Sequence, residues 1–214
     1  MFSGSLTAIL LGALLGLRHA TDADHLAAVT AIVARERSLA RAARVGALWG
    51  VGHTLTLLAV GGAIIFFRLV IPPRVGLGLE FAVALMLIVL GYTNLRTPRA
   101  SEAERTMLRP FLVGTVHGLA GSAAVALLVL ATIRNTLPAL AYLTVFGLGT
   151  ILGMVLATVM IAAPAMRLGA ESDRWNRGVR LTAGALSIAI GVMLAHGIIA
   201  EGGLFSAAPT WVPR

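Results

Sequence analysis

The chain has 214 residues, of which 58% are hydrophobic and 12% are charged. Its mean hydropathy is +0.91, whereas a soluble domain carries about 25% charged residues. The net charge of +8 does not indicate a nucleic-acid partner, because the arginines fall in short segments between apolar runs. No cysteine is present, which excludes disulfides and thiolate metal sites. No basic segment precedes the first apolar run, so we expect no cleaved signal peptide. This composition predicts an all-α membrane protein.

Apolar runs long enough to cross a bilayer recur along the chain. We predict six transmembrane helices, at about 4–34, 45–71, 75–95, 110–133, 139–166 and 179–202. Twelve arginines flank the loops that follow the first, third and fifth spans, and four flank the opposite side. Positive residues mark cytoplasmic loops. We therefore expect a multi-pass protein of the cytoplasmic membrane with both termini outside.

The two halves of the chain resemble each other. "LGLRHATDADHLAAV" at 15–29 aligns with "VGTVHGLAGSAAVAL" at 113–127, which places His19 over His117 at an offset of 98. "WGVGHTLTL" aligns with "FGLGTILGM" at an offset of 97, and "IVLG" with "IAIG" at an offset of 100. A three-helix unit that is repeated once must be inverted in the membrane, as in many secondary transporters. We expect one transmembrane domain over 1–214, with inverted three-helix repeats at about 4–95 and 110–202.

The stretch "RHATDADH" at 18–25 places five ionisable groups inside the first span. That span would measure about 46 Å as one straight helix, which exceeds the hydrocarbon core of about 30 Å. Thr21 and Asp24 have the spacing of a helix-starting capping box. The sequence therefore predicts a first helix broken at the motif, with one half ending near His19 and the other starting near Asp22.

Ionisable groups at the bilayer centre each cost at least about 2.5 kcal/mol, so they must bind something or satisfy one another. One interpretation is structural: Arg18 pairs with Asp22, and the histidines cap carbonyl groups. The other is a divalent metal site, since imidazole and carboxylate ligands suit nickel, cobalt, zinc and manganese. A straight helix would keep His19 and His25 from sharing one ion, whereas a broken one would not.

Two further histidines reach the same depth in the second and fourth spans. The candidate metal-binding residues are His19, Asp22, Asp24, His25, His53 and His117. Near the outer ends of their spans, we expect His196 to be an interfacial or access residue and Glu80 to snorkel to water.

The first motif resembles the signature of the nickel/cobalt transporter family, R-H-A-x-D-A-D-H-I, with Leu26 in place of its isoleucine. "GVGHTLT" resembles the family's second motif, with Thr54 in place of serine. "VHGLAGSAA" departs from the family's later acidic motif and looks more like the shorter, urease-accessory branch. The resemblance implies metal uptake through residues His19, Asp22, Asp24, His25 and His53.

We therefore predict a secondary transporter that imports a divalent metal ion and is not an enzyme. The expected substrate is nickel, and cobalt is the second choice. The expected partners are the divalent metal ion and the lipid bilayer, with no cofactor and no nucleic acid; whether a homo-oligomer forms stays open. A metal exporter of the same superfamily is the closest alternative, although histidine-free loops favour import. An alternative of another class is an intramembrane serine protease that uses Ser122 and His196, although "AGSA" lacks the first glycine of G-x-S-G.

Overall fold

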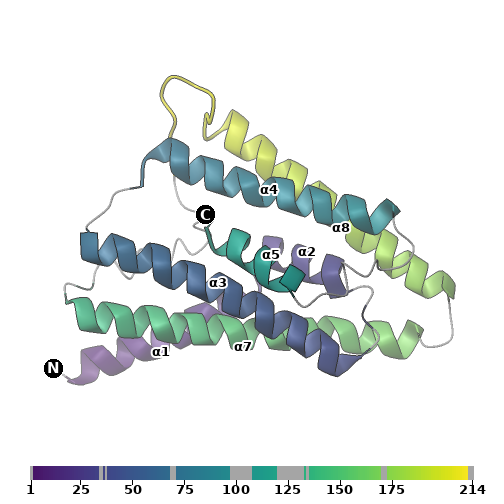
Figure 1. The fold of residues 1–214 in the computed structure, drawn as a ribbon, viewed down its shortest axis with the longest axis horizontal. Helices are drawn as coiled ribbons and strands as arrows, with labels where there is room; N and C mark the ends of the chain where they lie inside the picture. The colour runs from purple at the N-terminus through teal and green to yellow at the C-terminus, as the bar shows by residue number, and fades with distance from the viewer. Residues whose placement is uncertain are drawn as a thin grey trace.

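The computed structural model describes residues 2–33, 36, 38–67, 71–96, 108–119, 133, 135–169 and 173–211. These residues contain seven helices and no strand. The helices (Figure 1) are α1 (Phe2–His19), α2 (Ala23–Val33), α3 (Leu39–Phe67), α4 (Pro73–Arg96), α5 (Leu108–Leu119), α7 (Thr136–Gly169) and α8 (Asp173–Ala200).

Within the described part of the chain, four helices are long and apolar enough to cross a membrane: α3, α4, α7 and α8. The predicted first span is two shorter apolar helices, since α1 ends at His19 and α2 begins at Ala23. The predicted break is therefore confirmed. Within the predicted fourth span, α5 covers its first part, and 120–132 lie outside the described residues. The count of six spans stays a prediction.

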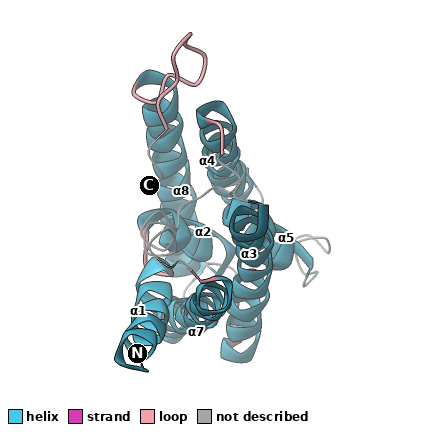
Figure 2. Cartoon of the chain, turned by 90° about the vertical axis from the view of Figure 1, so that its left-hand side faces the viewer, coloured by secondary structure: helices cyan, strands magenta, loops and turns pink. Residues whose placement is uncertain are grey.

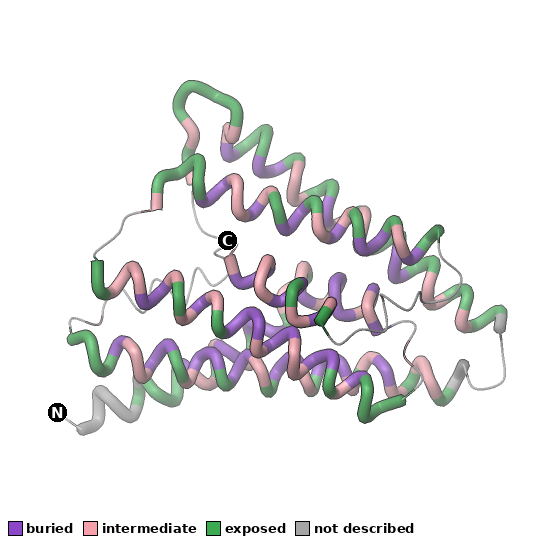
Figure 3. The backbone as a smooth tube through the Cα atoms, in the orientation of Figure 1, coloured by how far each residue is buried: buried purple, intermediate pink, exposed green. Residues whose placement is uncertain are grey.

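The helices form two layers with the short helix α2 between them. Figures 1 and 2 show α4 beside α8 in one layer and α1, α3 and α7 in the other, with α5 packed against α3. Buried residues follow the inward faces of the helices (Figure 3). Large apolar side chains such as Leu14, Leu152 and Met160 are exposed, as expected of helix faces that contact lipid tails.

Close packing at glycines fixes the relative directions of the helices. Gly46 of α3 faces Met154 of α7, and Gly61, further along α3, faces the earlier residue Leu143. α3 and α7 are therefore antiparallel, and contacts of the same kind make α4 and α8 antiparallel. α1 runs parallel to α7, and α5 runs parallel to α3. Among the described helices, α1, α3 and α4 thus run opposite to their counterparts α5, α7 and α8, as an inverted repeat requires.

The same kind of contact joins the two halves of the chain twice. A Cβ atom on Gly16 would overlap the backbone carbonyl of Phe146, and one on Gly114 would overlap that of Trp49. The offsets of the sequence repeat relate these two contacts to each other. Small residues let transmembrane helices approach closely. These contacts support the two-repeat organisation, which remains a prediction for the part of the second half that is not described.

The prediction that Glu80 snorkels is wrong. Its side chain is buried, and its Oε1 accepts a hydrogen bond of 2.9 Å from the indole Nε1 of Trp211. The C-terminal segment 201–211 folds back over α4, where Arg74 donates to the carbonyl of Ser206 at 3.0 Å. Trp211 also packs against Gly76. The indole donor satisfies Glu80 in place of water.

Candidate metal centre

The break between α1 and α2 is a tight turn made by the motif itself. The backbone N–H of Thr21 donates to the carbonyl of Arg18 at 2.8 Å, and that of Asp22 donates to His19 at 3.1 Å. The carbonyl of Asp22 accepts the first bond of α2, from Leu26 at 3.0 Å. The predicted capping box at Thr21 is wrong, because its hydroxyl donates to the Arg18 carbonyl at 2.6 Å instead.

Four histidines from four different helices gather at this break. The imidazole rings of His25 and His117 lie 4.0 Å apart between centroids, and those of His19 and His25 lie 4.5 Å apart. The ring of His53 lies 5.1 Å from that of His19 and 5.2 Å from that of His25. None of the four residues is more than 5% exposed. The fold thus brings the four predicted histidines together in a buried position.

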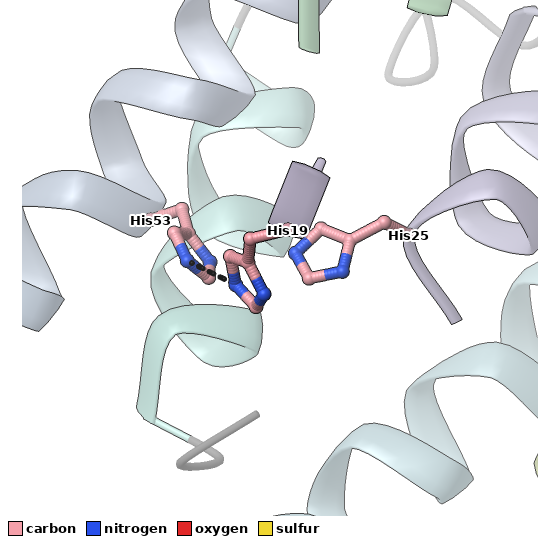
Figure 4. Close-up of side chains that lie close together, drawn as sticks. All are labelled: His19, His25 and His53. Atoms are coloured by element: carbon pink, nitrogen blue, oxygen red, sulfur yellow. Dashed lines mark hydrogen bonds between the residues drawn. The ribbon is translucent and has the colours of Figure 1, made fainter. Parts of the chain in front are cut away.

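The rings of His19 and His53 face each other through their Nε2 atoms, 3.2 Å apart (Figure 4). On an ion that binds imidazole nitrogen at about 2.0–2.1 Å, two such ligands lie about 3.3 Å apart in tetrahedral geometry and about 2.9 Å apart at a right angle. The observed separation matches one edge of such a coordination shell. Two nitrogen lone pairs at this distance need a proton or a cation between them.

His25 completes a first set of ligands with His19 and His53. The donor atoms of this set all lie within 4.8 Å of one another. Among the described residues, the Nε2 atom of His25 has no hydrogen-bond partner. Its Nδ1 lies 3.1 Å from the Oδ1 atom of Asp24, an arrangement that leaves the Nε2 lone pair available to a metal.

A second set of possible ligands consists of Asp24, His25 and His117. Its donor atoms also lie within 4.8 Å of one another. The carboxylate of Asp24 spans the two rings: its Oδ1 faces His25, and its Oδ2 lies 2.9 Å from Nε2 of His117. Oδ1 also accepts the backbone N–H of His25 at 2.9 Å. The second set therefore contains one anionic oxygen donor and two imidazoles.

Asp22 lies at the same turn but in neither set. Its Oδ2 is 2.9 Å from Nδ1 of His19, and its side chain is 42% exposed. This bond directs the other nitrogen of His19 toward His53. Among the described residues, no ion pair joins Asp22 to Arg18, so the predicted pairing of these two residues is wrong.

Two aromatic residues at the centre were missed from the sequence. The ring of Trp49 stacks on His25 at 6.1 Å between centroids, and that of Phe146 lies 5.5 Å from His19. Both residues are almost completely buried. The sequence repeat contains a sign of their role, because it aligns Trp49 with Phe146. An apolar residue in a transmembrane helix, however, usually serves only to pack against its neighbours.

The protease alternative gains no support from the fold. Ser122 lies outside the described residues. His196 is exposed on α8, whereas a catalytic histidine must be oriented by a neighbouring group.

Comparison with known proteins decides the family. The chain is 32% identical over 218 residues to the urease accessory protein UreH of Bacillus sp. (strain TB-90), which covers 94% of this chain and 95% of the relative. The chain belongs to the UreH family. This family is the urease-accessory branch of the nickel/cobalt transporter family whose signature the first motif resembles. No family model matches the chain, and no solved structure matches it.

Proposed function

We propose that this UreH-family chain is a secondary transporter that imports a divalent transition-metal cation across the cytoplasmic membrane. Nickel is the substrate we expect first, and cobalt next. The chain acts without a cofactor and catalyses no covalent reaction. The observation that carries the proposal is the buried cluster of four histidines and Asp24 at a broken membrane helix.

The donor atoms support a metal ion of borderline Lewis-acid hardness rather than a hard or a soft ion. Imidazole nitrogen binds nickel, cobalt and zinc well, whereas magnesium and calcium prefer oxygen ligands alone. The chain has no cysteine, and thiolate is a preferred ligand of Cu(I). The pairing of His19 with Asp22 is the arrangement that orients a metal-binding imidazole.

The position of the cluster also supports transport. His19 is the last residue of α1, and the C-terminal end of a helix carries a partial negative charge that favours a cation. Broken helices near the bilayer midplane are where secondary transporters bind their substrates. The near-complete burial of the four histidines supports a site in which the ion is held away from bulk water.

Membrane potential supplies enough energy for uptake. A dication that moves to a negative interior gains about 4.6 kcal/mol at 100 mV, twice the value for one charge. The sequence contains no lysine, so the phosphate-binding loop of nucleotide-driven pumps is absent. The arginine distribution supports an orientation with both termini outside.

The experiment is nickel uptake in cells that lack their own nickel importers. Expression of this chain should raise accumulation of nickel, and the His25→Ala chain, present in the membrane at equal amount, should not. Reduced accumulation would instead support the exporter alternative. Accumulation that is equal in cells with and without the chain would contradict the proposed function.

A further inference from the structure

The two ligand sets share one residue, the imidazole of His25, and differ in every other member. We infer that the substrate ion occupies two successive positions in this protein and passes between them while bound to His25. This inference rests on the proposed function and deepens it. At the first position the ion would be held by His19, His25 and His53, and at the second by Asp24, His25 and His117.

The donor chemistry distinguishes the two positions. The first offers three imidazoles, and the second offers two imidazoles and a carboxylate. His19 and His53 are already in contact through their Nε2 atoms, at 3.2 Å, and Asp24 and His117 are in contact at 2.9 Å. Each pair therefore lies within the span of one metal shell, because its two donor atoms are as close as two ligands of one ion. Both pairs lie beside the ring of His25.

A different aromatic residue lies beside each of the two positions. The ring of His19 lies 5.5 Å from that of Phe146, with an interplanar angle of 37°. The ring of His117 lies 5.8 Å from that of Trp49, at 44°. The sequence repeat relates these two contacts to each other. Trp49 and Phe146 each lie about three turns into their helices, α3 and α7, and these helices run antiparallel.

Exchange of ligands at a shared imidazole gives the ion a short path. The ion exchanges His19 and His53 for Asp24 and His117, and His25 stays bound throughout. A strongly held ion leaves a site slowly, so a transport path benefits from several weaker positions in sequence. The carboxylate of Asp24 attracts the dication toward the second position.

Cobalt binding to the full-length protein in lipid nanodiscs tests the inference. Co²⁺ alone is the probe, and X-ray absorption counts its imidazole ligands. His117→Ala should leave a shell with three imidazoles, and His53→Ala should leave one with two imidazoles and a carboxylate. Both variants should still bind Co²⁺. His25→Ala should weaken binding by more than the roughly 10–100-fold that loss of an orienting partner costs.

Matched variants separate this result from a folding defect. His53→Phe and His117→Phe keep a ring in each place and should give the same shells as the alanine variants. His196→Ala, at an exposed position on α8, should bind Co²⁺ as the natural chain does. Identical shells in the His53 and His117 variants, or loss of binding in either one, would overturn the two-position inference and leave a single site. Absence of Co²⁺ binding by the natural chain would overturn the proposed function as well.

Discussion

The Nε2 atoms of His19 and His53 lie 3.2 Å apart although the residues are 34 positions apart in the sequence. Both residues are buried, and Asp22 occupies the other ring nitrogen of His19. Because two lone pairs at that distance repel, a proton or a metal ion must lie between them. The metal interpretation makes the pair one edge of the binding centre and gives the following predictions.

Removal of a ligand histidine should abolish transport without removing the protein. His53→Ala leaves His19 without its facing nitrogen, and nickel uptake should fall to the level of cells without the chain. The Met193→Ala chain is the control, since that residue of α8 is exposed and belongs to neither ligand set. Normal uptake by His53→Ala, at equal membrane abundance, would show that the cluster is structural.

Asp22→Asn should weaken the centre without destroying it. The amide of asparagine accepts a hydrogen bond from Nδ1 of His19 more weakly than the carboxylate does. The imidazole of His19 is therefore less well oriented and less basic. Loss of such a partner costs about 10–100-fold in metal affinity. Nickel affinity of the purified chain is the measurement. A larger loss, equal to that of His25→Ala, would indicate that Asp22 is itself a ligand.

The paired glycine contacts predict a pattern of stability. Gly16→Ala and Gly114→Ala should each lower the temperature at which the purified protein aggregates, because the new methyl group would overlap a backbone carbonyl. Gly62→Ala is the matched control, since its Cβ would meet nothing within 4 Å. At that position, alanine should be neutral or stabilise the helix by up to about 1 kcal/mol. Equal thermal stability of all three variants would contradict the packing.

Phe146 and Trp49 should close the centre from opposite sides. The chain has no cysteine, so Thr150→Cys, at a fully buried position, reports access by a membrane-impermeant thiol reagent. Adding Phe146→Ala should speed labelling from the face where α7 begins, and Trp49→Ala from the face where α3 begins. We expect each substitution to raise the labelling rate about tenfold, which corresponds to destabilising the closed state by about 1.4 kcal/mol.

Leu87→Ala, a fully buried residue of α4, controls for general loosening of the bundle in this assay. Labelling that rises equally from both faces, or equally with Leu87→Ala, would show that the two aromatic residues only fill space.

The broken helix was predictable because polar groups and span length conflict locally. A span of 31 residues with five ionisable side chains at its centre favours a break, and this conflict lies within 4–34 alone. The polar groups are the decisive part, because α7 is an unbroken helix of 34 residues. The choice of cap was not predictable in the same way. Thr21 and Asp22 are both good cap residues, and the geometry of the turn makes Asp22 the residue that directly precedes α2.

The grouping of the ligands depends on contacts that no local pattern contains. Asp22 and Asp24 both lie in the motif, yet only Asp24 bridges His25 and His117, because the turn directs Asp22 toward His19. Glu80 was misread for a similar reason: its partner, Trp211, is 131 residues away. Sequence spacing identifies the residues that carry the chemistry, and tertiary packing decides which of them meet.

Transport by the purified chain in sealed lipid vesicles tests the central claim most directly. A potential, negative inside, is imposed with a potassium gradient and valinomycin, and entry of Ni²⁺ is followed with a trapped dye. The natural chain should accumulate Ni²⁺, the rate should fall when the potential is removed, and the His25→Ala chain should match empty vesicles. Equal Ni²⁺ entry into vesicles with the natural chain, with His25→Ala and with no protein would contradict transport through the histidine centre.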